Sequence, residues 1–304
     1  MIIAKPIQLR SKGHDLDMDE RSLGRYRDCS DMVGDLGRLR EHMREEGYVF
    51  LRGYLDCEDV LEARRAMTER LAAEGILDPE HPAMEAVAHP DYRGDQAHLL
   101  ARDCPELEKV LYAGPMMAFF EGFLGRPVYH YTYTWLRALA PGVGTPMHCD
   151  VVYMGRGARS NLYTAWTPLG AIDLELGGLM MLERSHLLDR LRNTYCKRDV
   201  DAWCTNRRGG DKVKTMNGEN GILAPDPNRI RKSLGGRWFV GEFEPGDLIV
   251  FNVFMVHAGL DNQSDRIRLS SDSRYQPADE PFDDRWNGPD PPRHGPRAKR
   301  GMVC

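Results

Sequence analysis

The chain has 304 residues, of which 41% are hydrophobic and 29% are charged, and these proportions match those of ordinary soluble globular proteins. This composition excludes a largely disordered chain. The formal net charge of −5 is small for this length, so we expect neither nucleic acid nor a membrane surface as a partner.

The first 125 residues are predicted to form an α-rich region that supports the rest of the fold. Between residues 31 and 48, apolar side chains recur at helical spacing and Gly47 ends the pattern, which predicts an amphipathic helix. Residues 48–55 are predicted to form a strand, and residues 59–71 a second helix.

After about residue 125 the sequence changes to short β-type segments separated by Gly and Pro. These segments are residues 128–139, 146–154, 161–169, 177–185, 237–258 and 267–276. Because no helical patterns alternate with them, they favour a barrel or sandwich over a parallel α/β sheet. We therefore predict a mainly β fold with flanking helices, built on a jelly-roll core.

Two further segments lack the β pattern. Residues 187–236 are polar, charged and Gly-rich, and they form an insertion within the core that is either a solvated loop or a functional lid. Residues 278–304 are Pro- and Arg-rich with no apolar period and are predicted to form an irregular C-terminal arm. We expect a single domain over residues 1–304, in which residues 126–277 are the β core.

Two features favour a cytoplasmic location. The N-terminal residues contain no apolar core of the kind found in secretory signals, and no stretch approaches the roughly 18 apolar residues of a membrane span.

The seven cysteines are an odd number and are scattered without a C-x-x-C pair. We therefore expect reduced thiols rather than a disulfide framework or a zinc ribbon.

The segment PMHCDVVYM contains a candidate pair of metal ligands. His148 and Asp150 are two residues apart on a predicted strand, where alternation places both side chains on one face. Such a pair is common by chance, but a third ligand, His257, is available from the later segment FNVFMVHAG. Two imidazoles and one carboxylate suit Fe(II) and leave three coordination positions open for substrates. We predict that these three residues form a catalytic metal site.

A candidate anion clamp follows the third ligand. Arg268 stands eleven residues after His257, and Ser270 shares its strand face. A guanidinium fork beside a hydroxyl matches the distal carboxylate of a dicarboxylate such as 2-oxoglutarate. Arg266, two residues earlier on the same face, is a competing candidate, and physical reasoning from the spacing does not decide between the two arginines.

Four segments resemble the phytanoyl-CoA dioxygenase-like branch of the Fe(II)/2-oxoglutarate oxygenases. They occur in the family's order and span residues 45–277: EEGYVFLRGYLD, PGVGTPMHCD, AWTPLGAIDLELGGLMMLERSH and EPGDLIVFNVFMVHAGLDNQSDRIRLSSDSRYQP. The resemblance implies a double-stranded β-helix, the jelly roll of cupin-like proteins. It also implies that Fe(II), 2-oxoglutarate and dioxygen take part in the reaction.

The resemblance also implies roles for single residues. The iron ligands would be His148, Asp150 and His257, and the C5 carboxylate of 2-oxoglutarate would be held by Arg268 with Ser270. Three more residues occupy positions where the family lines the co-substrate pocket, with ordinary barrel core as the alternative for each: Trp166, Thr164 and Tyr131. One departure is Glu183-Arg184, which stands where the family commonly shows Pro-Gly and puts the local turn in doubt.

The primary substrate is expected to be a small organic molecule, and the sequence leaves its identity and the oligomeric state open. Tyr153 and Arg159 follow the ligand motif, and Trp203 lies in the insertion. These positions make the three residues candidates for substrate binding.

The function predicted from the sequence is an Fe(II)- and 2-oxoglutarate-dependent dioxygenase that hydroxylates, or otherwise oxidises, a C–H bond and releases succinate and carbon dioxide. Asp150 favours hydroxylation, since halogenating members of the family have a small residue in place of the carboxylate. Two alternatives are a cupin-like metal protein with non-redox activity, such as a hydrolase or isomerase, and a non-catalytic binding module. The first of these has no use for Arg268 and Ser270.

Overall fold

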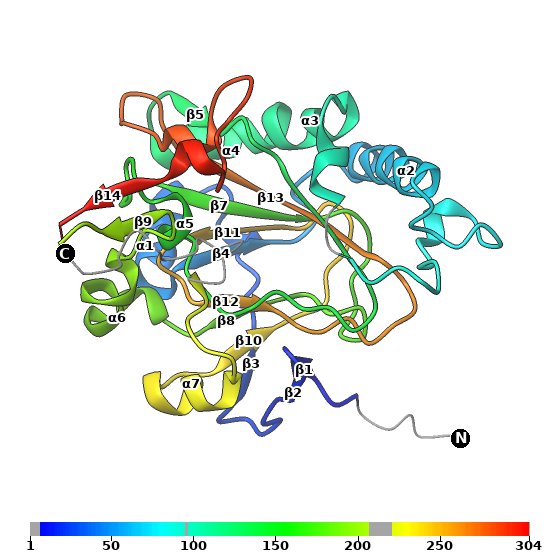
Figure 1. The fold of residues 1–304 in the computed structure, drawn as a ribbon, viewed down its shortest axis with the longest axis horizontal. Coiled ribbons are helices and arrows are strands. Elements are labelled where there is room, and N and C mark those ends of the chain that lie inside the picture. Colours follow the sequence, from blue (N-terminus) through cyan, green and yellow to red (C-terminus); the bar gives the residue numbers. More distant parts are fainter. Residues whose placement is uncertain (1–6, 95–96, 207–220, 304) are drawn as a thin grey trace.

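The computed structural model describes residues 7–94, 97–206 and 221–303, and two facing β-sheets form its core (Figure 1). The larger sheet contains β4 (Tyr48–Leu51), β5 (Val128–His130), β6 (Trp135–Leu139), β7 (Tyr163–Pro168), β11 (Leu248–Asn252) and β13 (Arg268–Pro277). The smaller sheet contains β3 (Leu23–Arg25), β8 (Leu179–Leu182), β10 (Trp238–Val240) and β12 (His257–Gly259).

Strand pairing in both sheets is almost entirely antiparallel. The larger sheet has the order β4-β11-β7-β13-β5, with β6 also paired to β13, and the smaller has the order β12-β8-β10-β3. Strands that are neighbours in space are therefore far apart in the chain, and among the described strands of these two sheets only β10 and β3 run parallel. This arrangement confirms the predicted jelly-roll core.

Four helices of the N-terminal region cover the outer face of the larger sheet or its edge (Figure 1). They are α1 (Leu36–Glu46), α2 (Cys57–Ala73), α3 (Pro105–Tyr112) and α4 (Gly114–Leu124). Helix α1 begins where the Asp35 side chain accepts a hydrogen bond from the Arg38 backbone, and it ends at Gly47, whose φ of 81° favours glycine. On α4, the Phe120 ring stacks against Tyr275 of β13 with centroids 3.9 Å apart.

Successive side chains of strand β13 point alternately toward the apolar core and toward a pocket between the sheets. Leu269 and Tyr275 face the apolar core beneath the helices, whereas Arg268, Asp272 and Arg274 line a pocket between the two sheets. The strand's 2-residue period therefore places a row of charged side chains on a buried inner face. Such a row requires partners, because burying an unpaired charge is costly.

The insertion and the C-terminal arm contain more regular structure than their composition predicts. The described part of the insertion includes α6 (Asp189–Asn193), β9 (Ala202–Cys204) and α7 (Pro227–Leu234). The expectation of an irregular arm is wrong at its end, where β14 (Arg300–Met302) pairs in parallel with β9. The pairing joins two segments that are a hundred residues apart, so no local pattern could reveal it. An N-terminal hairpin, β1 (Arg10–Ser11) and β2 (His14–Asp15), completes the described strands.

Cys204 corrects the expectation that every cysteine is a reduced thiol, because it is disulfide-bonded. The five other cysteines in the described ranges are free: Cys29, Cys57, Cys104, Cys149 and Cys196.

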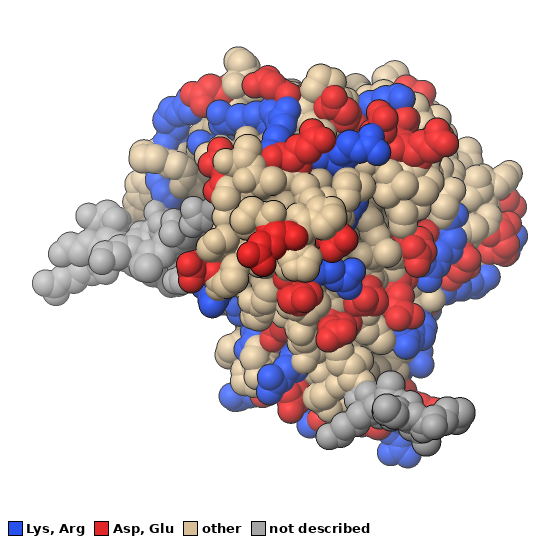
Figure 2. Space-filling view, turned by 90° about the vertical axis from the view of Figure 1, so that its right-hand side faces the viewer, with Lys and Arg blue, Asp and Glu red and all other residues tan. Residues whose placement is uncertain are grey.

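In the described ranges no helix has both the length and the apolar character needed to span a bilayer. The face shown in Figure 2 mixes acidic and basic side chains without a broad area of one sign.

Candidate metal centre

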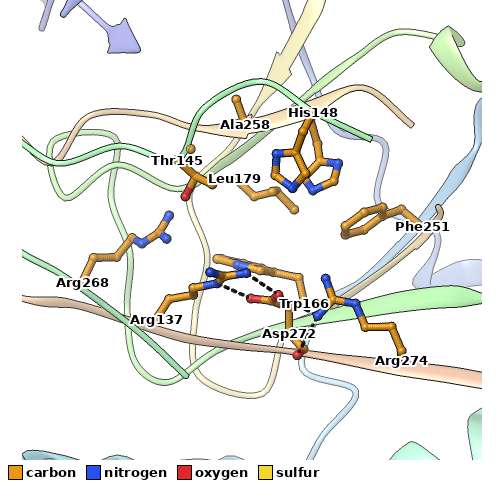
Figure 3. Close-up of a pocket in the computed structure, with 12 residues that line it drawn as sticks. Arg137, Thr145, His148, Trp166, Leu179, Phe251, Ala258, Arg268, Asp272 and Arg274 are labelled. Carbon is orange, nitrogen blue, oxygen red and sulfur yellow. Dashed lines mark hydrogen bonds and ion pairs between the residues drawn. The ribbon is translucent and has the colours of Figure 1, made fainter. Parts of the chain in front are cut away.

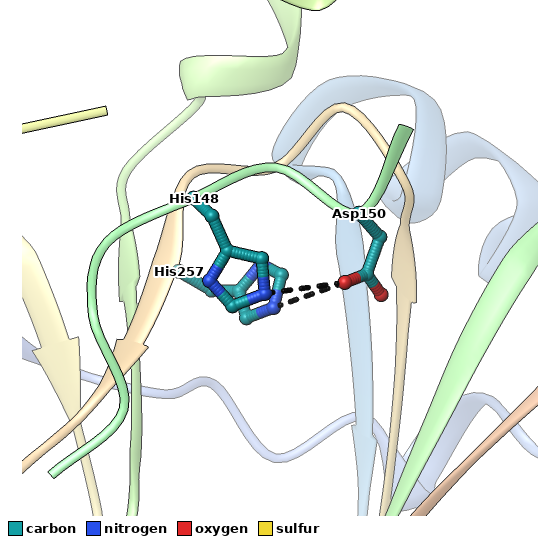
Figure 4. A group of neighbouring side chains, drawn as sticks. All are labelled: His148, Asp150 and His257. Carbon is teal, nitrogen blue, oxygen red and sulfur yellow. Dashed lines mark ion pairs between the residues drawn. The ribbon is translucent and has the colours of Figure 1, made fainter. Parts of the chain in front are cut away.

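Two histidines and one aspartate converge at one end of the space between the sheets (Figure 4). Each of His148, Asp150 and His257 offers one ligand atom, and these atoms all lie within 4.8 Å of one another. The Oδ1 atom of Asp150 is 3.3 Å from Nε2 of His148 and 3.5 Å from Nε2 of His257. All three residues are buried. The structure therefore brings together the three residues that the sequence predicts as ligands.

Asp150 reaches this position by a route that differs from the sequence prediction. The chain is extended only up to His148, which forms an isolated bridge with His257. Asp150 has helical backbone angles (φ −58°, ψ −30°) and precedes the short helix α5 (Val151–Met154). The prediction of one strand carrying both His148 and Asp150 is wrong. A tight turn, rather than strand alternation, places the carboxylate beside the imidazole.

Backbone carbonyl groups orient both imidazoles. Nδ1 of His148 lies 2.7 Å from the Pro146 carbonyl oxygen, and Nδ1 of His257 lies 3.0 Å from that of Met255. Because a carbonyl can only accept, each Nδ1 carries a proton, and in the neutral ring Nε2 is left free to coordinate. Burial, together with the neighbouring His148, lowers the pKa of His257 to about 4. This ring is therefore neutral and able to coordinate at physiological pH.

The carboxylate of Asp150 is held in its ionised form. Burial by itself raises the pKa of Asp150, but the positive charge of Arg274 and the interactions with His257 and His148 outweigh burial and hold that pKa well below its usual range. Its Oδ2 atom accepts hydrogen bonds from Nη2 of Arg274 at 2.8 Å and from Oγ1 of Thr164 at 2.5 Å. Thr164 thus contacts the metal-ligand candidate directly.

The donor set fits a divalent transition metal. The two Nε2 atoms lie 3.3 and 3.5 Å from Oδ1 of Asp150, an arrangement of donor atoms that a cation would stabilise. Two neutral imidazoles and one carboxylate are a ligand set that Fe(II) accepts, with open positions remaining. Within the described ranges, no second group of three such side chains meets the same distance criterion.

A buried guanidinium lies at the other end of the same pocket (Figure 3). Nη1 of Arg268 donates to the Gly177 carbonyl oxygen at 3.0 Å, while its Nε and the hydroxyl of Ser270 are buried without a hydrogen-bond partner. Burial and the nearby charge of Arg137 lower the pKa of Arg268 to about 10. Two unsatisfied buried donors side by side fit an anionic group such as a carboxylate.

Arg266, the competing arginine, lies outside this pocket. Its Nη2 pairs with Asp173 at 3.1 Å, and its side chain is 38% exposed. By contrast, Arg268 is almost fully buried and lines the pocket. The geometry therefore favours Arg268 as the anion clamp.

Three pocket residues were missed by sequence reasoning. Arg137 of β6 forms two hydrogen bonds with Asp272, at 2.9 and 3.0 Å, and Asp272 accepts a third from Arg274 at 2.8 Å. The available signal was the run of polar residues at every second position of β13: Arg268, Ser270, Asp272 and Arg274. On a strand this spacing predicts one shared face.

The remaining candidates divide into pocket residues and residues engaged elsewhere. Trp166 lines the pocket, and the Tyr153 ring stands edge-on to His148 with centroids 5.3 Å apart. The Tyr131 hydroxyl accepts a hydrogen bond from the Asp283 backbone within the apolar core. Arg159 donates to the Cys196 carbonyl oxygen, and Trp203 lies in β9 beside β14. The structure does not bring the last three to the pocket.

The turn at Glu183-Arg184 is formed without glycine. Arg184 adopts a left-handed backbone conformation with φ of 52°, which favours glycine and costs other residues about 1 kcal/mol or more. Glu183 is fixed by two hydrogen bonds to the Arg237 side chain, at 3.1 and 2.9 Å. The turn therefore forms without the Pro-Gly pair. The Ser185 hydroxyl accepts a hydrogen bond from the Val256 backbone at 2.9 Å, next to His257.

Comparisons with known proteins agree with this geometry. A family model described as phytanoyl-CoA dioxygenase (PhyH) matches residues 43–270. The chain is 28% identical to 1-deoxypentalenic acid 11-beta-hydroxylase from Streptomyces exfoliatus, over 84% of this chain and 87% of that protein. It is 25% identical to the peroxisomal phytanoyl-CoA dioxygenase of Mus musculus, over 79% of this chain and 68% of that protein.

Solved structures share the fold. EctD from S. alaskensis in its apoform has a TM-score of 0.56 at 14% identity, covering 97% of this chain and 98% of that one. The non-heme alpha ketoglutarate dependent carbocyclase SnoK has a TM-score of 0.55 at 20% identity, covering 82% of this chain and 88% of that one. These likenesses confirm the predicted double-stranded β-helix.

Proposed function

Because this chain belongs to the phytanoyl-CoA dioxygenase family and is a 2-oxoglutarate-dependent non-haem iron dioxygenase, we propose that it hydroxylates a C–H bond of a small organic molecule. The observation that carries the proposal is the pairing of two features in one pocket. His148 and His257 line one end and converge with Asp150, and Arg268, whose Nε is unsatisfied, lines the other. The unsatisfied hydroxyl of Ser270 belongs to the same face of β13 as Arg268.

The three converging side chains are the proposed iron ligands. Nε2 of His148, Nε2 of His257 and Oδ1 of Asp150 would hold the metal, and the backbone carbonyl groups behind Nδ1 of each imidazole keep the rings in orientation. When bound, iron(II) with 2-oxoglutarate supplies the oxidising chemistry that inserts one oxygen atom of dioxygen into a C–H bond, with succinate and carbon dioxide as co-products.

The other end of the pocket is the proposed site for the distal carboxylate of 2-oxoglutarate. Nε of Arg268 and the Ser270 hydroxyl would donate to this group and so lose their unsatisfied state. Trp166 forms part of the wall between the two ends. A metal-dependent hydrolase would have no need for these buried donors, so they support the oxygenase over that alternative.

The described part of the insertion lies against the segment that carries Asp150. The Leu223 backbone donates to the Met147 carbonyl oxygen at 2.8 Å, and the Val200 backbone donates to that of Val152 at 3.1 Å. The insertion thus lies against the chain on both sides of Asp150. A cover at this place would limit the access of water, which protects a reactive site and strengthens its electrostatic interactions. This placement supports the lid interpretation for the described part of the insertion.

Hydroxylation is the proposed outcome because the carboxylate of Asp150 occupies the position that halogenating members leave small. The relatives from Streptomyces are hydroxylases whose names specify an organic acid. We therefore propose small organic acids as the first substrates to screen.

The test combines a spectrum with a product assay. Anaerobic addition of Fe(II) and then 2-oxoglutarate should produce a visible charge-transfer band, and a true substrate should stimulate succinate release in step with a product that has gained one oxygen atom. Intact, metal-loaded protein that gives no such band would contradict the proposed co-substrate site. Succinate release without an oxygenated product would contradict hydroxylation.

A further inference from the structure

The two oxygen atoms of the Asp150 carboxylate have different surroundings. Oδ2 accepts two hydrogen bonds, one from Nη2 of Arg274 at 2.8 Å and one from Oγ1 of Thr164 at 2.5 Å. Oδ1 faces the two Nε2 atoms at 3.3 and 3.5 Å. One oxygen is thus occupied by donors from β13 and β7, and the other is directed toward the proposed metal position.

Arg274 is itself held in one geometry. Its Nη1 donates to Oδ2 of Asp272 at 2.8 Å and to the Asp272 carbonyl oxygen at 3.2 Å, and its guanidinium lies 4.2 Å from the ring centroid of Trp135. Arg137 fixes Asp272 from the other side through two hydrogen bonds. Charges therefore alternate from Arg137 to Asp150, and Arg274 has little freedom to leave the carboxylate.

This arrangement limits how the carboxylate can bind a metal. Using both oxygens would require Oδ2 to break two buried hydrogen bonds, one of them charge-assisted, and such bonds are costly to leave unmade. A carboxylate that binds through one oxygen leaves three of six positions open, as a two-histidine, one-carboxylate site requires. A carboxylate that binds through both oxygens would fill one of the positions needed by the co-substrates.

We propose that Arg274 and Thr164 are positioning residues that occupy Oδ2 of Asp150, so that this ligand binds the metal through Oδ1 alone. The inference rests on the proposed function, because it assumes that Asp150 is a metal ligand. Neither residue coordinates the metal. Both act through the carboxylate, and their removal changes metal affinity and ligand geometry even where no turnover takes place.

The test measures binding of the metal alone to the purified full chain. Dissociation constants for Fe(II), under anaerobic conditions, and for Co(II) are obtained by competition with a chromophoric chelator, and the Co(II) absorption spectrum reports the coordination geometry. The variants are Arg274→Gln, Arg274→Lys and Thr164→Val. Arg52→Gln is the control, because Arg52 also pairs with a buried aspartate, Asp247, at 2.7 Å. Arg52 directly follows β4, the strand at one edge of the larger sheet.

The expected result is graded. Arg274→Gln weakens binding by about 10- to 100-fold, the usual effect of losing a partner that orients a metal ligand, and it alters the Co(II) spectrum as the carboxylate turns. Thr164→Val has a smaller effect in the same direction, and Arg274→Lys recovers part of the loss because it restores one charge-assisted bond. Arg52→Gln binds both metals as the unmodified chain does.

Two outcomes contradict the inference separately from the proposed function. If folded Arg274→Gln and Thr164→Val bind Co(II) within a factor of two of the unmodified chain and give the same spectrum, the positioning role is wrong. If Arg274→Gln does not fold, Thr164→Val and Arg274→Lys decide the question by the same criteria. If His148→Ala and Asp150→Ala keep full metal affinity, the metal site itself is wrong, and the positioning role falls with it.

Discussion

His148 and His257 are joined directly through their backbones. The His148 amide donates to the His257 carbonyl oxygen at 3.0 Å, the His257 amide donates back at 2.9 Å, and the two ring centroids are 4.2 Å apart. Residues paired in this way in an antiparallel bridge project their side chains to the same side. The spacing of the two imidazoles is therefore set by the main chain, before any metal binds.

The first prediction follows from this backbone pairing. Replacing His148 or His257 by Ala leaves the two backbone hydrogen bonds in place, so we expect folded protein that has lost a metal ligand. Succinate formation should fall by more than about 100-fold, beyond the usual effect of losing a partner behind a ligand. The measurement is substrate-dependent succinate release at saturating Fe(II). His81→Ala, a change at an exposed histidine that pairs with Glu85, is the control and should keep normal turnover.

The second prediction concerns the anion clamp. Arg268→Gln removes the charge beside Ser270, and two charge-assisted hydrogen bonds together contribute about 3 kcal/mol, which corresponds to about a 100-fold rise in the KM for 2-oxoglutarate. Ser270→Ala should raise that KM by about 10-fold or less. Steady-state kinetics with varied 2-oxoglutarate provide the measurement. The clamp assignment would be refuted if Arg266→Gln, at the exposed ion pair with Asp173, raised the KM as much as Arg268→Gln does.

Sequence reasoning named residues at both ends of the pocket and Trp166 in its wall, but not the charged residues between the ends. The residue types indicated the chemistry of the three ligand candidates, whereas only the family resemblance favoured Arg268 over Arg266. Arg137, Asp272 and Arg274 acquire a role only through the register of β6 against β13. That register depends on contacts between residues far apart in the chain, and a one-residue shift would send each side chain to the opposite face.

Local backbone conformation was the second feature that the sequence did not predict. The alternation rule placed Asp150 beside His148 for the wrong reason, because the chain turns into α5 after Cys149. Composition likewise predicted irregular structure near the C-terminus, where β14 pairs with β9 of the insertion. In both cases tertiary contacts override a local preference, and short strands with few residues carry little pattern of their own.

The third prediction is a pH dependence of stability in the metal-free protein. The pKa of His257 is about 4 in the folded chain and about 6.5 when unfolded. Between these values the unfolded state binds the proton more readily. The contribution of His257 to the free energy of unfolding is therefore complete above about pH 6.5 and falls as the pH is lowered toward 4. The full contribution is about 3 kcal/mol, and roughly 2 kcal/mol of it should be lost by pH 5.

This pH dependence can be isolated with one variant. Other buried histidines with lowered pKa values, His42 and His186, contribute a similar trend, so the relevant quantity is the difference between the unmodified chain and His257→Gln. Urea denaturation of both metal-free proteins at pH 7 and pH 5 provides it. Equal losses of unfolding free energy in the two proteins would show that His257 does not titrate as its buried position beside His148 and Asp150 requires.

The fourth prediction concerns a buried cluster of charges that joins the insertion to the C-terminal arm. Arg285 is 1% exposed and donates to Asp283 at 2.9 and 2.6 Å, to Asp199 at 3.0 Å and to Asp201 at 2.7 Å. Arg285→Met leaves these carboxylates close together without their central cation. Removing one partner of a buried ion pair typically destabilises a protein by about 3–5 kcal/mol, and we expect a loss of unfolding free energy in this range.

Hydrogen exchange shows which segments of Arg285→Met lose stability. Because Asp199 and Asp201 belong to the insertion and Arg285 to the arm, the amides of residues 195–206 and 282–300 should exchange faster in Arg285→Met, while those of β13 keep their protection. Arg156, which lies in the turn after α5, pairs with Asp199 at 2.8 Å. Because this turn follows the ligand segment, loosening the cluster should also raise the KM for the primary substrate. Arg297→Gln, at an exposed pair with Asp290, should change stability by less than about 0.5 kcal/mol. Uniformly faster exchange across β13 and the arm would instead mean that the cluster stabilises the whole domain rather than the cover over the pocket.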